Sequence, residues 1–207
     1  MGNMFFKAAI AGTAATLSVI TLNLEAAQAI TFNLGGFPTV SSSFFLQEDG
    51  IGLTINGSDE NGNSRSVARG PNGVGVFLDG SADDFETDGF GPDETLNLLF
   101  DSTVDLISAT FSRVGFNDDF RLFVDGSATV DADIPGGNIF DFGIGTFDFT
   151  PFETIGDQFG FTVIGFNDDF FLKSVEVEKV PEPALMLGLG AVAAGLLAQK
   201  RSRKETV

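Results

Sequence analysis

The stretch DGSADDFETDGFGPDE, residues 79–94, gathers more carboxylates than any other segment of similar length in this sequence. Hard oxygen ligands in a flexible loop are what Ca²⁺ prefers in proteins, so this stretch is a candidate calcium site. It departs from the common helix-flanked calcium loop, because Asp84 stands where that loop needs glycine and Phe90 where it needs glutamate. A solvated acidic loop is the alternative interpretation, and both stay open. The candidate ligands are Asp79, Asp83, Asp84, Glu86 and Asp88, with Asp93 and Glu94 beyond them.

Most other chemistry is excluded by the residue types that the sequence lacks. Without His or Cys, the chain has no imidazole base, no thiolate nucleophile and no zinc ligands of the usual nitrogen and sulfur kind. Sugar binding stands beside calcium binding as an alternative function, although the absence of Trp and Tyr removes the aromatic rings with a polar handle. Glycoside hydrolysis by two carboxylates comes third, because so acidic a chain offers many pairs and distinguishes none. We therefore predict that the protein is not an enzyme.

The hexapeptide GFNDDF occurs twice, at residues 115–120 and 165–170. In both copies an alternating apolar run precedes the Asn-Asp-Asp step, and a second apolar run follows it. Asn and Asp tolerate left-handed backbone dihedrals and form local hydrogen bonds, which favours tight turns. We expect each copy to form the turn of a β-hairpin, with the two hairpins in equivalent places.

The elements that must position these residues are short β-type runs. Strict alternation of apolar and polar residues, as in SVEVEKV, indicates strands with one buried face. We expect strands at residues 30–34, 43–46, 52–55, 73–78, 95–100, 106–115, 120–124, 128–132, 140–149, 159–165 and 170–178. Turn sequences separate them at Asn56-Gly57, Asn61-Gly62, Asn72-Gly73, Asp125-Gly126 and Pro135-Gly136-Gly137. The pattern predicts an all-β fold, an antiparallel β-sandwich or jelly-roll-like domain over residues 30–178, with a core dominated by the chain's 24 Phe.

The charge of the predicted domain limits its partners. Residues 30–180 contain 6 basic and 26 acidic residues, a net charge of about −20. Such a surface repels phosphates, so we expect no binding of nucleic acid. Cations are the favoured counterparts of this surface, because they relieve its self-repulsion.

Both ends of the chain carry targeting features. Residues 1–29 combine Lys7, an apolar run and the small-residue step Ala27-Gln28-Ala29, which predicts a signal peptide cleaved after Ala29. Near the other end, the uncharged residues 183–198 would form a helix of about 24 Å, just short of the hydrocarbon thickness of a bilayer. A basic cluster follows and would stop translocation, holding that end in the cytoplasm, with residues Lys200, Arg201, Arg203 and Lys204.

The order of Pro181-Glu182-Pro183, apolar segment and basic cluster resembles the PEP-CTERM sorting signal of cyanobacterial and other Gram-negative surface proteins. The resemblance covers about residues 180–204 of the C-terminal segment 179–207, with Ala184 where a hydroxyl residue is common and Ser202 interrupting the basic run. It implies processing near the Pro-Glu-Pro motif by an exosortase-like membrane enzyme. The product would be released to, or attached at, the envelope or the extracellular polysaccharide. We therefore expect an exported, non-catalytic cell-surface or extracellular-matrix protein, inserted in the membrane by its C-terminal helix before processing.

Overall fold

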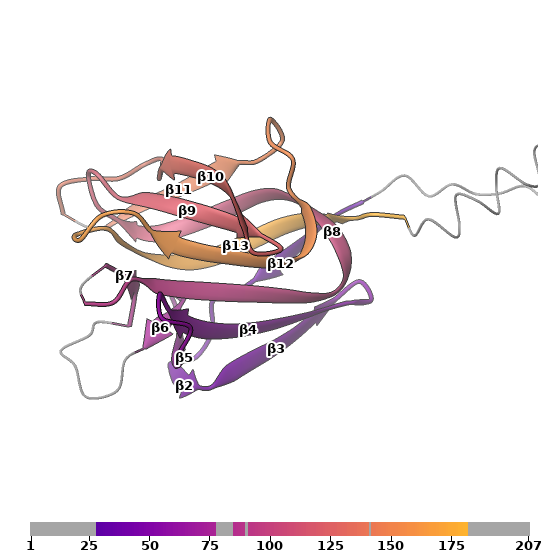
Figure 1. Ribbon diagram of the computed structural model, residues 1–207, viewed down its shortest axis with the longest axis horizontal. Coiled ribbons are helices and arrows are strands. Elements are labelled where there is room, and N and C mark those ends of the chain that lie inside the picture. Colours follow the sequence, from indigo (N-terminus) through magenta and orange to yellow (C-terminus); the bar gives the residue numbers. More distant parts are fainter. Residues whose placement is uncertain (1–27, 78–84, 90, 141, 182–207) are drawn as a thin grey trace, which may run out of the picture.

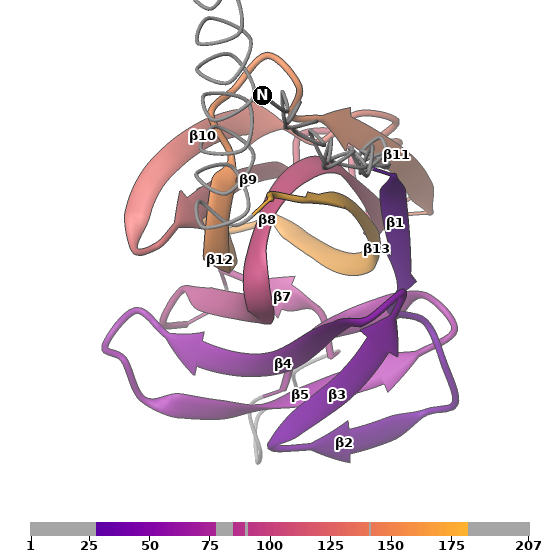
Figure 2. The same ribbon diagram turned by 90° about the vertical axis from the view of Figure 1, so that its right-hand side faces the viewer.

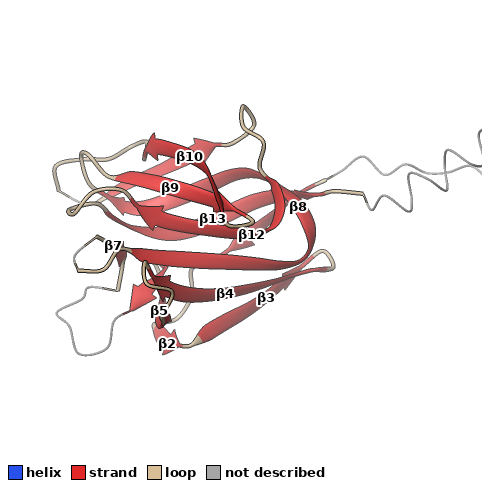
Figure 3. Ribbon diagram, viewed as in Figure 1, coloured by secondary structure: helices blue, strands red, loops and turns tan. Residues whose placement is uncertain are grey.

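The computed structural model describes residues 28–77, 85–89, 91–140 and 142–181. Every regular element in those ranges is a β-strand, as Figure 3 shows, and the predicted all-β class is confirmed. No helix in the same ranges is long and apolar enough to cross a membrane. The predicted signal segment up to residue 27 and the predicted apolar and basic segments from residue 182 onward lie outside the described residues.

The described strands all pair in antiparallel fashion, and several follow the expected alternation of buried and exposed residues, as in β4 and β9. In chain order they are β1 (Ala29–Asn33), β2 (Thr39–Ser41), β3 (Ser43–Glu48), β4 (Ile51–Asp59), β5 (Ser64–Gly70), β6 (Gly73–Phe77), β7 (Thr87–Asp88), β8 (Glu94–Val114), β9 (Asp119–Val124), β10 (Ser127–Asp133), β11 (Gly143–Asp148), β12 (Ile155–Val163) and β13 (Asp169–Lys179).

The long strand β8 organises the fold. Its first part pairs with β4 and β12, and its second part pairs with β11 and β13. Figure 1 shows β8 curving from the layer that holds β4 into the layer that holds β13. Because β13 also pairs with β6, and β6, β5 and β4 follow in the ladder, five strands close into a barrel with outer strands added to it. The layers are thus joined by hydrogen bonds through β8, whereas two separate sheets were expected.

The core is built around phenylalanine rings. Phe111 on β8 lies 5.0 Å from Phe120 and 5.2 Å from Phe170 between ring centroids, the latter edge to face. Such tilted and edge-to-face contacts add specificity to the burial of large apolar side chains. The fully buried Phe side chains are Phe32, Phe111, Phe120, Phe149, Phe159, Phe161 and Phe170.

Turn chemistry explains most of the connections but not all. Asp125 and Gly126 both have positive φ, 48° and 78°, and join β9 to β10 in the expected tight hairpin. The prediction of a turn at Asn56-Gly57 is wrong, because Gly57 lies inside β4 and pairs with Leu96. A Cβ at this glycine would come within 3.1 to 3.3 Å of three neighbouring residues. The glycine is needed there for close approach of another part of the chain.

The two ends of the domain lie side by side. β1 pairs with β13, and Ala29 lies opposite Glu178. The chain therefore enters and leaves at one end of the domain, which we call the terminal end (Figures 1 and 2). The two GFNDDF copies lie at the opposite end, because they follow the last residues of β8 and β12, Val114 and Val163.

Candidate functional site at the turn end

The surface opposite the termini gathers both GFNDDF copies and β7. Val163 at the end of β12 pairs with Phe120 at the start of β9, which brings the two copies together. The N–H of Gly89, just after β7, donates a hydrogen bond of 3.2 Å to the carbonyl oxygen of Asp168. We call this surface the turn end, comprising residues 86–89, 115–119, 133 and 164–169.

The two copies of the motif fold in the same way. The buried carboxylates of Asp118 and Asp168 accept hydrogen bonds of 2.5 and 2.6 Å from the N–H groups of Gly115 and Gly165. Each bond joins residues three apart and closes a tight turn, which is the local chemistry expected of Asp in such sequences.

The expectation that each copy closes a hairpin is wrong. β8 and β9, which flank the first copy, are not paired with each other, and neither are β12 and β13, which flank the second. β12 pairs with the first part of β8 on the edge opposite β4, and β9 follows β12, whereas β11 and β13 flank the second part of β8. Each copy therefore crosses from one group of strands to the other, which Figure 2 shows as β12 and β13 on different sides of β8.

Burial differs sharply between the two Phe positions of the motif. The final residues, Phe120 and Phe170, are completely buried and both contact Phe111. The first Phe of each copy is at the tip of its turn, and Phe116 and Phe166 are 78% and 71% exposed. The glycine, the buried Asp and the final Phe have structural roles in the turn and the core, whereas the first Phe presents most of its surface to solvent.

Carboxylates also face each other at the turn end. Asp119 lies opposite Asp133 between β9 and β10, and Asp169 lies opposite Asp88 between β13 and β7. Like charges directly opposite each other destabilise a β-sheet. Burial raises the pKa of Asp119 to about 6, with further contributions from a hydrogen bond to Asp133 and from the charges of Asp168 and Asp133. This surface therefore takes up a proton at mildly acidic pH.

The pairing of Asp119 with Asp133 does not suit glycoside hydrolysis. Catalytic carboxyl groups of glycosidases stand about 5 to 9.5 Å apart, because the sugar and often a water molecule must fit between them. Asp119 and Asp133 instead lie within hydrogen-bonding reach of each other, which is closer than that separation.

The candidate calcium ligands are only partly described. Asp79, Asp83 and Asp84 lie outside the described residues. Glu86 is buried and forms an ion pair with Arg113, with 2.9 Å between Oε1 and Nε. Asp88 donates its backbone N–H to Glu94 at 3.3 Å and is paired with β13. Within the described ranges no three acidic side chains form a group that could hold a metal ion.

The residues of the predicted processing steps are at the terminal end. Ala29 is the exposed first residue of β1. Val180 donates its backbone N–H to the carbonyl oxygen of Thr103 at 3.1 Å, and Pro181 is the last described residue. The rest of the sorting motif, Glu182 and Pro183, and the basic cluster Lys200, Arg201, Arg203 and Lys204 lie outside the described residues.

Comparison with known proteins adds no relative. No family model, no curated protein and no solved structure matches the chain.

Sequence reasoning missed the exposed Phe116 and Phe166 and the facing pair Asp119 and Asp133 as features of one surface. The repeat itself was the available signal, since a hexapeptide used twice invites a position-by-position comparison. Which of its two Phe is buried depends on the strand that follows, and which carboxylate faces Asp119 depends on the register of β10.

Proposed function

We propose that the chain is an exported, non-catalytic protein of the cell surface or extracellular matrix, sorted through its Pro-Glu-Pro segment by an exosortase-like enzyme. One observation carries this proposal. The folded strands run from Ala29 to Lys179, and the two segments with predicted targeting roles adjoin those limits at the same end of the domain. The described core and the turn end consist of residues between those limits, so removal of either segment should leave them intact.

The start of the sorting motif suits a processing enzyme. The last backbone hydrogen bond of the domain in the described part of the chain is that of Val180 with Thr103. Pro181 and Pro183 each fix φ and lack an N–H, and each restricts the residue before it, so regular helix or strand is disfavoured across the motif. We expect the sequence after the last strand to be extended, which would present Glu182 as a side chain to be read.

The test replaces Pro181-Glu182-Pro183 with three alanines in the full chain. We expect export to continue while the unprocessed form accumulates in the membrane fraction. Pro151→Ala, in an exposed turn between β11 and β12, is the matched control and should be processed normally. A mature wild-type protein that still ends at Val207 by mass spectrometry would overturn the proposal.

Carbohydrate binding at the turn end is the second candidate, and the exposed Phe116 and Phe166 favour it. An apolar sugar face can stack on a Phe ring, and the neighbouring carboxylates can accept hydrogen bonds from sugar hydroxyl groups. Extracellular polysaccharide is the partner that fits an exported protein. Binding to a glycan array should be lost in the double variant Phe116→Ala and Phe166→Ala and kept in Phe45→Ala, which removes an exposed ring on β3. Equal binding by all three proteins would exclude the tips as the site.

We also propose that the domain is a variant of the jelly-roll-like sandwich, in which two strand groups share β8. The two GFNDDF crossings between the groups support this classification.

A further inference from the structure

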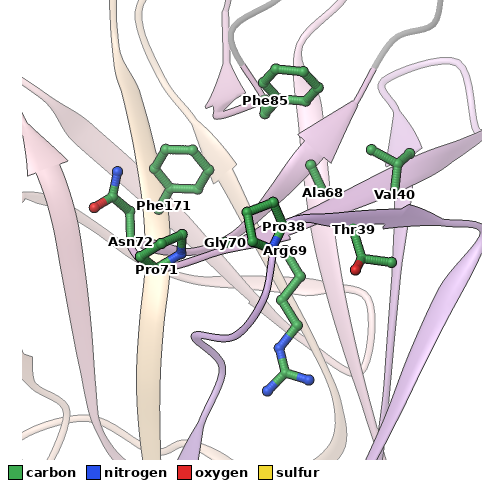
Figure 4. Close-up of a pocket in the computed structure, with 10 residues that line it drawn as sticks. All are labelled: Pro38, Thr39, Val40, Ala68, Arg69, Gly70, Pro71, Asn72, Phe85 and Phe171. Atoms are coloured by element: carbon green, nitrogen blue, oxygen red, sulfur yellow. The ribbon is translucent and has the colours of Figure 1, made fainter.

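A pocket of about 380 Å³ lies next to the β5–β6 turn, between β2 and Phe85. This volume falls in the range of about 300 to 1,000 Å³ that is usual for small-molecule sites. Figure 4 shows Phe171 on one side, Val40 and Ala68 on the other, and Phe85 above them. Its apolar lining consists of Pro38, Val40, Ala68, Pro71, Phe85 and Phe171.

Phe85 is held over this pocket in an unfavourable backbone conformation. Its φ is 75°, which is a rare value for a bulky residue without a special role. The ring is stacked on Phe77, with centroids 5.0 Å apart and planes 13° from parallel, yet the residue remains 43% exposed. A Cβ at Gly75 would collide with the carbonyl oxygen of Phe85, so the backbone is seated against that glycine. Backbone strain of this kind is typical of ligand-holding positions.

The described residues of the lining offer no free charge for an ionic ligand. Arg69 is the one ionisable residue among them, and Nε and Nη2 of Arg69 donate hydrogen bonds of 2.8 and 2.7 Å to the carbonyl oxygens of Leu34 and Gly35. In Figure 4 the Arg69 side chain extends away from Phe85 and Phe171. The net charge of about −20 over residues 30–180 also opposes the approach of anions.

We infer that this pocket binds a small uncharged molecule rich in hydrocarbon, of the class of a long-chain alcohol. An apolar guest in this pocket removes its own apolar surface and that of the lining from water, which is favourable. The two Phe rings supply contact area for a chain or a flat ring, and Thr39 and Asn72 at the margin are neutral partners for a hydroxyl group. This inference is independent of the sorting and sugar-binding proposals.

The test uses the full chain in nanodiscs and a dodecanol that carries a photoreactive diazirine near its tail. After illumination, peptide mapping should find the label on lining residues such as Val40, Ala68 and Phe171. Unmodified dodecanol should compete with the label, and dodecanoate, which has the same chain with a carboxylate, should not.

Two variants test the pocket by different means. Ala68→Leu fills it from β5 and should lower labelling of the lining about tenfold, because the added side chain takes the apolar space of the ligand. Ala128→Leu, at an exposed position of β10, is the matched control and should label like the wild type. Phe85→Gly removes one ring and relieves the strained φ, so it should fold and also label weakly.

Several outcomes would overturn the inference. Label confined to peptides outside the lining, or equal labelling of the wild type and Phe85→Gly, would show that the pocket takes no ligand. Equal competition by dodecanoate would refute the uncharged class. Labelling of the lining that falls as the protein concentration rises, with the probe held constant, would show that the surface is an interface between chains.

Discussion

Replacing Asp119 with asparagine should stabilise the domain at neutral pH. Asp119 lies opposite Asp133, and the charge of Asp168 also acts on it. Asparagine has nearly the same shape, can still donate a hydrogen bond to the Asp133 carboxylate, and carries no charge. The substitution therefore removes the like-charge repulsion and keeps the local geometry.

The sign and size of the effect follow from the raised pKa. Burial and the neighbouring carboxylates raise the pKa of Asp119 from 3.8 to about 6. A group whose pKa is higher in the folded state stabilises that state fully below the unfolded pKa, and this contribution disappears as the pH rises through 6. A shift of about two units corresponds to at most about 3 kcal/mol. Because Asp119 is partly exposed, solvent screening reduces this to about 1 to 2 kcal/mol.

The assay is thermal unfolding followed by far-ultraviolet circular dichroism between pH 4 and pH 8. At pH 7.5, Asp119→Asn should raise the midpoint by about 2 to 8 °C, whereas near pH 4 it should change little. Asp157→Asn, an exposed position on β12, is the control and should follow the wild type at every pH. If the melting midpoint of Asp119→Asn depends on pH between 4 and 7 as that of the wild type does, ionisation of Asp119 does not destabilise the domain and the reasoning is wrong.

Three further predictions concern the turns, the core and the acidic loop. Asp118→Ala and Asp168→Ala should each cost about 1 to 3 kcal/mol in urea unfolding, because a glycine N–H loses its carboxylate acceptor; an effect below 0.5 kcal/mol would refute the capping role. Phe111→Ala should cost about 3 to 5 kcal/mol, since both motif copies pack on that ring, and a smaller loss would mean that the core repacks around it. Millimolar Ca²⁺ should raise the melting midpoint no more than Mg²⁺ at equal ionic strength, because Glu86 is already paired with Arg113; a calcium-specific rise that follows ligand concentration would place a site in the acidic loop after all.

The local sequence pattern was sufficient to predict strands that have one buried face and one exposed face. In β9 the buried residues recur at every second position, and in β13 they do so over Val175–Glu178, and the predicted ranges 120–124 and 170–178 fall within one residue of the observed ones. Alternation works there because one face packs on the core while the other meets solvent. No partner strand has to be known for that inference.

The bend in β8 could not be predicted in the same way. Sequence reasoning expected two strands, at 95–100 and 106–115, because the alternation is interrupted around Asp101 and Thr103. The chain stays extended through this interruption. Before it β8 pairs with β4, and after it β8 pairs with β13. The continuity of β8 thus depends on pairing with strands distant in the sequence. The polar residues in its middle resemble a turn when the sequence is read alone.

Three short strands were missed for a related reason. β5, with the sequence SRSVARG, has little apolar alternation, and its two arginines bind groups outside the strand. Arg65 pairs with Asp59, and Arg69 donates to the backbone at residues 34 and 35. β2 and β7 are only three and two residues long. Such strands exist because a neighbouring ladder offers free hydrogen-bonding groups, which a single sequence does not reveal.

The GFNDDF repeat separates what local chemistry decides from what it does not. The turn itself was predictable, because the Asp carboxylate and the glycine N–H that close it are three residues apart. The strand after each turn can return beside the strand before it or cross the core. Its course depends on where the final Phe of the motif is buried, and both copies bury this Phe against Phe111. Both crossings contain that buried anchor and the carboxylate cap. Phe116 and Phe166 at the tips are largely exposed, and the loss or retention of glycan binding in their double variant decides whether these rings recognise a sugar.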